Sequence, residues 1–266
     1  MDHLPSPTVL ASGISVLRAE NPSEMTLDGT NSYLLFDQGL DAPSAGSAVI
    51  VVDPGPQLEE HMAALAAFDV RLILSTHRHP DHTAAVARLH ELTGAPARAR
   101  LEQFCHGAPV LEDGEVIVAA GTSVQVVLTP GHTSDSLCLV QLGAHPQLLT
   151  GDTVLGRGTT ILEHPDGTLA DYLDSLAKLA ALPDMPLRPG HGEQHAGSHR
   201  LLAAYIKHRE ERLEQVRAAL AKLGKAGADA QPAELLEFVY PDLDPRLVGA
   251  ASHSIQAQLH YLATKS

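Results

Sequence analysis

Aromatic residues are scarce in this sequence: they make up 3% of its 266 residues, and tryptophan is absent. Leucine, valine, isoleucine and alanine must therefore fill most of the core. Hydrophobic residues still account for 44% of the chain, which is enough for a sizeable core. The length suits one large domain, or a domain of about 200 residues with a small appendage.

Cysteines and long apolar segments are also lacking. The two cysteines, Cys105 and Cys138, are too few for a disulfide framework in a chain of this length. Cys138 lies in the apolar run Leu137–Val140, which indicates a core position. No apolar run approaches the ~20 residues of a membrane span, and the first 30 residues contain no stretch typical of a signal peptide. We expect a soluble, cytoplasmic protein without a membrane partner.

Basic residues are outnumbered by acidic ones, 18 to 32, which gives a net charge of −14. The imbalance lies in the first part of the chain. Residues 1–199 hold 9 basic and 24 acidic residues, a balance of −15, whereas residues 200–266 hold 9 and 8, a balance of +1. Such an acidic domain repels polyanions, including nucleic acids, unless bound cations offset its charge.

Short β-rich segments recur in the first part of the chain, and each runs into a polar loop. Apolar runs and apolar alternation predict strands over residues 48–52, 70–74, 124–128 and 147–150. Helical spacing predicts helices over residues 58–66, 83–92 and 169–179. Thr168 and Asp171 resemble a capping box at the start of the last of these. Strands covered by helices indicate an α/β sandwich with its loops gathered at one edge.

Four side chains of the metal-ligand type follow the predicted strand 70–74 within six residues: His77, His79, Asp81 and His82. His77 and His79 can point the same way because alternate residues of an extended segment share a face. Asp81 and His82 then point to a neighbouring position. Such a group can hold two metal ions about 3.5–4 Å apart.

Three further candidate ligands, His132, Asp152 and His191, each follow a strand-like run in a loop that contains glycine. Glycine lets the backbone turn sharply and approach closely. An aspartate can bridge two cations, and neutral imidazoles suit zinc. If these loops meet at one edge of a sheet, the sequence predicts a dinuclear metal centre.

The order His-x-His-x-Asp-His, followed by His, Asp and His, resembles that of the metallo-β-lactamase superfamily. The resemblance implies an α/β fold, the αββα sandwich, and two divalent metal ions, most often Zn²⁺, with Mn²⁺ or Fe²⁺ as alternatives. It also implies the roles: the first metal is bound by His77, His79 and His132, the second by Asp81, His82 and His191, Asp152 bridges both, and Asp53 supports the histidine loop from behind.

Departures from the superfamily pattern reduce the number of activities to expect. Asp152 stands where the main antibiotic-hydrolysing class has cysteine, so true β-lactamase activity is not expected. Residues 26–34, 151–160 and 171–176 resemble segments of the β-lactamase-like protein 2 group. Members of that group are known as single-strand endoribonucleases and carry a small C-terminal winged-helix-like domain. The resemblance implies a catalytic domain over residues 1–199 and a helical, winged-helix-like domain over residues 200–266.

The sequence of the C-terminal part predicts three helices, over residues 200–223, 233–239 and 246–262. The first is locally basic. A solvated helix face with i,i+4 ion pairs explains such a pattern, and so does a phosphate-contacting surface that covers one side of the site. In the second case, Lys207, Arg209 and Arg212 are the expected contacts.

We therefore expect a hydrolase in which two metals supply a bridging hydroxide, with Asp81 and Asp152 as the catalytic carboxylates. The acid for the leaving group is either Asp81 or a metal-bound water. The expected partner is a small molecule or a short single-stranded RNA, cleaved at a phosphodiester. The alternatives are a glyoxalase-II-like thioesterase, a persulfide dioxygenase with one iron, and a nucleic-acid-binding module with an inactive metal domain.

Overall fold

The computed structural model describes residues 4–264, so the outer ends of the two predicted domains, residues 1–3 and 265–266, lie outside the described residues. The chain separates into two units by its internal contacts. The first unit comprises residues up to 128 together with 135–158 and 184–198, and the second comprises 129–134, 159–183 and the residues from 199 onward. The predicted boundary at residues 199/200 stays a prediction of domain organisation.

Two mixed β-sheets form the centre of the first unit. One sheet has the order β1 (Thr8–Ala11), β2 (Ile14–Arg18), β3 (Asn31–Leu35), β4 (Ala48–Val52), β5 (Asp69–Leu74), β6 (Ala97–Arg98). The other has the order β11 (Leu187–Pro189), β10 (Gln147–Gly151), β9 (Leu137–Leu142), β8 (Thr122–Leu128), β7 (Val116–Ala119). The β4–β5, β5–β6 and β10–β11 pairs are parallel, and the remaining pairs are antiparallel.

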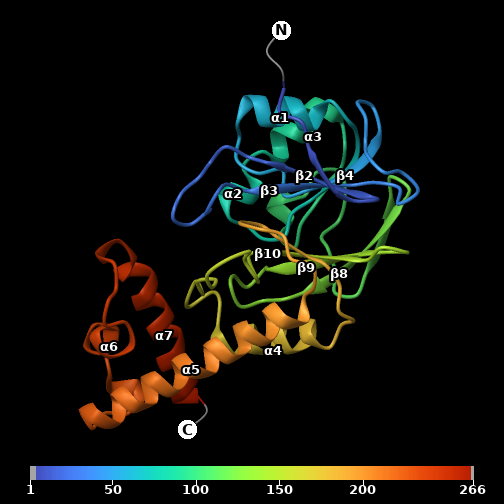
Figure 1. The fold of residues 1–266 in the computed structure, drawn as a ribbon. Coiled ribbons are helices and arrows are strands. Elements are labelled where there is room, and N and C mark those ends of the chain that lie inside the picture. The colour runs from blue at the N-terminus through green and yellow to red at the C-terminus, as the bar shows by residue number, and fades with distance from the viewer. Residues whose placement is uncertain (1–3, 265–266) are drawn as a thin grey trace. The chain divides into compact units, whose positions relative to one another are not determined.

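The two sheets enclose the main core of this unit. Tyr33 and Ile50 of the first sheet share one buried cluster with Val126 and Leu139 of the second. The other face of the first sheet packs against α1 (Glu59–Ala66) and α3 (Val86–Thr93), which Figure 1 shows lying over it. Because alternate residues of each strand point to opposite faces, strands buried on both sides are apolar throughout, as the sequence predicts.

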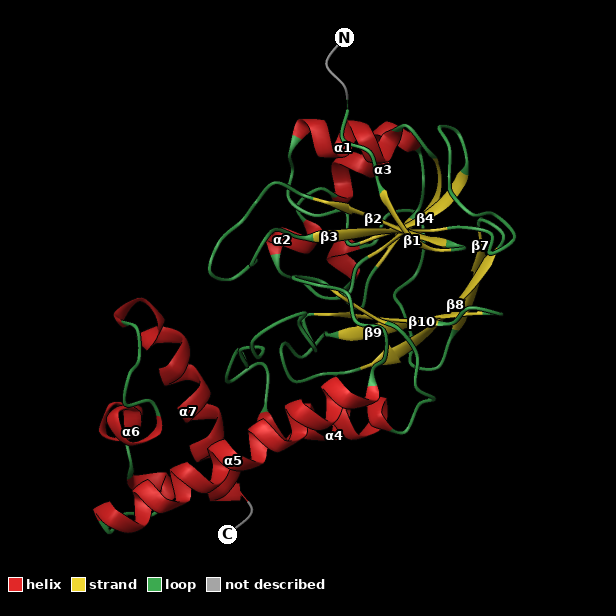
Figure 2. Cartoon of the chain, viewed as in Figure 1, coloured by secondary structure: helices red, strands yellow, loops and turns green. Residues whose placement is uncertain are grey.

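The second unit is mainly helical. It contains α4 (Leu169–Ala180), α5 (His199–Leu223), α6 (Pro232–Val239) and α7 (Val248–Thr264), drawn as helices in Figure 2. The Thr168 side chain accepts a hydrogen bond from the Asp171 backbone N–H and so caps α4 as predicted. Residues 199–264, the described part of the C-terminal region, contain no β-strand. The helical expectation is thus confirmed, whereas the winged-helix resemblance is not.

The predicted elements agree with the structure except near the histidine loop. The helix expected over 83–92 corresponds to α3, and a separate short helix, α2 (Pro80–Thr83), precedes it because Pro80 starts a helix directly after His79. Edge strands such as β7 were not predicted, since Val116 and Val118 point to solvent. Cys138 is fully buried, as expected. Within residues 4–264, no helix has both the length and the apolar character needed to cross a membrane.

Candidate metal centre

The histidine loop between β5 and α2 is held by main-chain hydrogen bonds. The Ser75 N–H donates to the Arg98 carbonyl, and the Thr76 carbonyl accepts from the Leu137 N–H. His79 is extended, with φ −60° and ψ 142°, and the helix begins at Pro80. The loop thus places His77 and His79 on an extended segment and Asp81 and His82 in the first turn of a helix.

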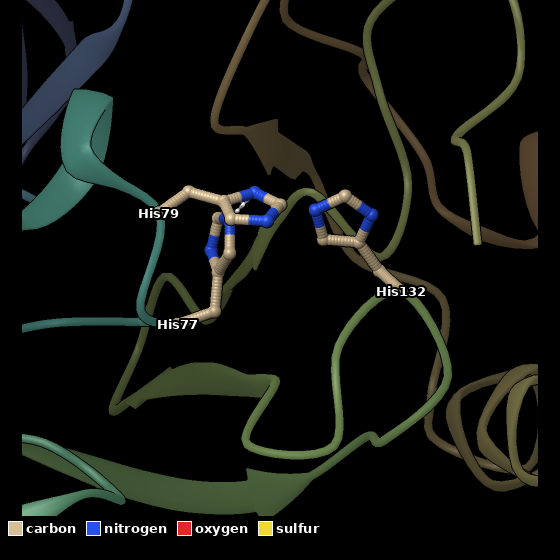
Figure 3. A group of neighbouring side chains, drawn as sticks. All are labelled: His77, His79 and His132. Atoms are coloured by element: carbon tan, nitrogen blue, oxygen red, sulfur yellow. Dashed lines mark hydrogen bonds between the residues drawn. The ribbon is translucent and has the colours of Figure 1, made fainter. Parts of the chain in front are cut away.

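Two groups of side chains in the first unit offer possible ligand atoms that lie within 4.8 Å of one another in each group. The groups are His77, His82 and Asp152, and Asp81, His82 and His191. His79 lies beside the first of them, with its Nδ1 3.0 Å from Nε2 of His77, and Figure 3 labels both side chains. Six of the seven predicted ligands thus lie together in this unit, and the seventh, His132, belongs to the second unit.

His82 and His191 approach each other from α2 and from the loop after β11. Their Nε2 atoms are 3.1 Å apart. Oδ2 of Asp81 lies 3.0 Å from Nε2 of His191, and Oδ1 of Asp152 lies 3.4 Å from Nε2 of His82. These inner nitrogens and oxygens all face one point.

The outer nitrogens of these imidazoles are fixed by acceptors. Nδ1 of His82 lies 2.9 Å from Oδ2 of Asp53, and Nδ1 of His191 lies 3.2 Å from the Gly29 carbonyl. A carbonyl and a carboxylate only accept, so each Nδ1 carries a proton and donates it. The lone pair of each Nε2 then points inward, which is how a neutral imidazole binds a metal.

Thr76 fixes His77 in the same way. Its hydroxyl donates to Oδ2 of Asp53 at 2.8 Å, so towards Nδ1 of His77, 3.1 Å away, the hydroxyl oxygen accepts. In the second unit, Nδ1 of His132 lies 2.6 Å from the Ile161 carbonyl and donates to it. Both histidines therefore keep Nε2 for a metal.

The donor set fits a metal ion. Two inward lone pairs 3.1 Å apart, as on His82 and His191, repel each other unless a cation lies close to both. Two ligands about 2.1 Å from a tetrahedral zinc would be about 3.4 Å apart, close to the inner-atom distances found here. Histidine nitrogens and carboxylate oxygens are also the ligand types that zinc prefers in proteins.

Without a metal, protons on His82 and His191 supply positive charge beside the carboxylates. Burial alone would lower the pKa of both histidines, but the carboxylate of Asp152 outweighs it, raising the pKa of His191 to about 9 and that of His82 well above its usual value. Burial alone would raise the pKa of Asp152, but His191 and His82 hold it well below its usual range. The pKa of Asp81 is likewise lowered, by His191 and His82, against the effect of burial. The carboxylates are thus anionic near neutral pH.

Two residues that the sequence analysis did not place in the site also shape it. The Asn31 amide donates to the carbonyls of Pro189 and Gly192 and so anchors the loop that carries His191. A Cβ at Gly190 would come within 2.6 Å of Asp152 Oδ1 and 2.8 Å of His82 Cε1. Asn31 lies in the segment 26–34 quoted for the family resemblance, which was the available signal.

The expected phosphate contacts of the long helix have other roles. Arg209 is 3% exposed; its guanidinium donates to the Thr160 carbonyl and lies 4.9 Å from the Tyr172 ring. Arg212 donates to the Val239 carbonyl and lies 4.5 Å from the Tyr240 ring. Lys207 is exposed and pairs with Glu211. Two of the three predicted contacts are therefore engaged within the helical unit itself.

Comparison with known proteins agrees with this geometry. Residues 25–191 match the family model described as "Metallo-beta-lactamase superfamily". The chain is 34% identical to the atrochrysone carboxyl ACP thioesterase of Aspergillus fumigatus, over 89% of this chain and 76% of that protein. It is 29% identical to the beta-lactamase-like protein 2 homolog of Drosophila melanogaster, over 97% of this chain and 90% of that protein.

A similar solved structure is that of a beta-lactamase domain protein from Burkholderia ambifaria, with a TM-score of 0.78 and 22% identity, covering 99% of this chain and 91% of that one. This likeness concerns the fold. The family-model match contains all seven predicted ligands, and the last of them, His191, is also the last matched residue. The chain belongs to the metallo-beta-lactamase superfamily.

Proposed function

We propose that this protein is a dinuclear metal-dependent hydrolase that cleaves thioesters. The observation that carries the hydrolase assignment is the set of inward Nε2 and carboxylate atoms around one point, in a chain of this superfamily. The name of the Aspergillus fumigatus relative, a thioesterase 34% identical to this chain, supports the substrate class. This proposal differs from the expectation drawn from the sequence, which favoured cleavage of a phosphodiester.

The proposed ligand sets follow the family pattern. One ion would be held by His77, His79 and His132 and the other by Asp81, His82 and His191, with Asp152 as a ligand common to both sets. Asp53 orients His82 through its contact with Nδ1. We propose Zn²⁺ for both positions because nitrogen and oxygen donors of this kind suit it. When bound, the ions lower the pKa of water at the site and polarise the bond under attack.

The protein's own groups favour a good leaving group. The pKa of Asp81 is lowered, so this carboxyl, which faces the centre, holds no proton near neutral pH. An alkoxide leaving from a phosphodiester or an ester needs a proton donor. A thiol has a pKa of about 8.5 and leaves as a thiolate with little assistance. A site with ionised Asp81 and Asp152 is therefore better matched to a thioester.

Charge also argues against a long nucleic acid. Residues 1–199 carry a balance of −15, and two divalent ions would offset about four of these charges. Arg209 and Arg212, which could have contacted phosphates, are engaged with carbonyls and aromatic rings. Single-stranded RNA remains the second candidate because of the likeness to the beta-lactamase-like protein 2 homolog.

The test is a matched substrate panel on purified protein whose metal content has been measured. It contains an acyl thioester of N-acetylcysteamine, the oxygen ester of the same acyl group, bis-p-nitrophenyl phosphate and single-stranded RNA. We expect kcat/KM for the thioester to exceed that for the oxygen ester at least tenfold. Turnover of RNA that is lost in Asp152→Ala, together with an inert thioester, would overturn the thioesterase proposal. One tightly bound iron with oxygen consumption on a persulfide would overturn the hydrolase proposal.

A further inference from the structure

The first unit also contains a pocket that none of the predicted metal ligands lines. It has a volume of about 600 Å³, within the range of small-molecule sites. Its walls come from β1, from residues 144–146 between β9 and β10 with Gln147 at the start of β10, and from residues 184–186, 188 and 194–196 on either side of His191.

Arg188 is the feature of this pocket that needs explanation. The residue is only 7% exposed, and its Nε donates to Oε1 of Gln147 at 2.9 Å. Gln147 is itself 2% exposed, and its Nε2 donates to the His145 carbonyl, which fixes the amide. Within residues 4–264, no carboxylate forms an ion pair with Arg188, although acidic residues outnumber basic ones 32 to 18.

A buried cation without a counter-ion is unfavourable, because its lost hydration is not replaced. Burial accordingly lowers the pKa of Arg188. The nearby Tyr33 phenol gives no negative charge, since burial raises its pKa. With Nε bound to Gln147, the terminal N–H groups of the guanidinium are the donors left for a ligand. Such a planar pair suits an oxyanion.

The neighbours of Arg188 add one donor and one opposing charge. The single proton of the Tyr33 hydroxyl is shared between two acceptors, the Pro189 carbonyl at 2.7 Å and Oε1 of Gln194 at 2.8 Å, and the Gln194 amide N–H groups remain as donors. The Asp184 carboxylate also lines the pocket. Its Oδ1 accepts from the backbone N–H and the hydroxyl of Ser198. No ion pair joins Asp184 to Arg188 within residues 4–264, so this carboxylate is not the counter-ion of the guanidinium.

We propose that this pocket binds a small ligand bearing an oxyanion, a carboxylate or a phosphate, with Arg188 as counter-ion and Gln194 as a second donor. The site is independent of the thioesterase proposal, because it uses no metal ligand. The ligand supplies the ion-pair partner that Arg188 lacks within residues 4–264.

Calorimetric titration of the metal-loaded full-length protein with sodium phosphate and with sodium acetate, at constant ionic strength, tests this. Wild type should bind at least one ion with a Kd on the order of 1 mM, a typical strength for a very small ligand. Arg188→Gln should weaken that binding at least tenfold and Gln194→Leu several-fold. The matched control Arg157→Gln removes an exposed arginine paired with Asp28 in the same unit and should bind like wild type.

Comparing wild type with the three variants distinguishes binding in this pocket from binding at the metal centre, which also attracts anions. Equal binding by all four proteins would place the ions at the metals and overturn the proposal. So would the lack of binding to wild type up to about 50 mM of either ion. If Arg188→Gln does not fold, unchanged binding in Gln194→Leu, a half-buried position, decides against it. The ratio of phosphate to acetate affinity identifies the oxyanion.

Discussion

Oδ2 of Asp53 lies 2.9 Å from Nδ1 of His82, and both side chains are buried. The other oxygen of Asp53 accepts from the Thr76 N–H at 2.8 Å. One carboxylate thus fixes the imidazole of His82 and the start of the histidine loop together. Asp53 does this from a left-handed backbone conformation, with φ 51°, which aspartate and asparagine tolerate better than most residues.

Asp53→Asn should lower the affinity for metal by about 10- to 100-fold, as is usual when a group that orients a ligand is changed. Asparagine keeps the backbone preference but replaces one acceptor oxygen by a donor. Metal content after dialysis against a competing chelator measures the effect. Asp28→Asn, which disrupts only an exposed pair with Arg157, is the control and should retain its metal. Equal retention in both variants would mean that Asp53 does not position His82.

Asp152→Ala should lose one metal ion per chain and nearly all turnover. Its carboxylate faces both His82 and His191, and in the proposed site it is the ligand shared by the two ions. Elemental analysis and activity should be measured on the same sample. A variant that keeps the metal content and the activity of wild type would show that the shared ligand has been assigned wrongly.

Gly190→Ala should impair the metal centre without removing any ligand. The added methyl would meet Asp152 Oδ1 and His82 Cε1 at 2.6 and 2.8 Å, so one or both ligands must move. A shift on the order of 1 Å in a site can lower kcat about 100-fold. Gly249→Ala, where a Cβ meets open space in α7, is the matched control. Equal kcat in the two variants would contradict the close packing of Gly190 against the ligands.

Acid should destabilise the protein through His61 of α1. Burial lowers the pKa of His61 to about 4, below the 6.5 of an unfolded histidine. The unfolded chain therefore binds the proton first, so stability is full above pH 6.5 and falls as the pH drops towards 4. Between pH 7 and pH 5 the loss from this residue is about 2 kcal/mol.

Urea unfolding of wild type and His61→Gln at both pH values isolates that contribution. The variant should lose about 2 kcal/mol less than wild type on acidification. His253→Gln, at an exposed position of α7, should behave like wild type. The same loss in His61→Gln as in wild type would mean that other groups cause the acid sensitivity.

Arg209→Met should destabilise the helical unit by about 2 kcal/mol, since a hydrogen bond from a charged donor and a cation–π contact are both lost. Lys207→Gln, on the same helix but exposed, should change stability by less than about 0.5 kcal/mol. Thermal unfolding measures both. If Arg209→Met keeps its stability but loses the salt dependence of RNA binding, the arginine serves as a phosphate contact and the present role is wrong.

Residue type and spacing were sufficient to predict six side chains that lie together in the first unit. Histidine and aspartate at alternate positions after an apolar strand can share one face, and the periodicity of strands and helices is local. The sequence also predicted the helices of the C-terminal part within a few residues. The sequence did not show that Arg209 contacts the Thr160 carbonyl and the Tyr172 ring, because helical spacing shows which residues share a face but not what that face meets.

The tertiary structure decided how the histidine cluster is held and where the pocket of Arg188 lies. His191 is oriented by the carbonyl of Gly29, 162 residues away, and a backbone carbonyl is present in every residue, so no residue type signals this contact. The uncompensated charge of Arg188 could not be predicted either. An ion pair depends on which side chains the fold brings within about 4 Å, and a count of charges along the chain does not contain that distance.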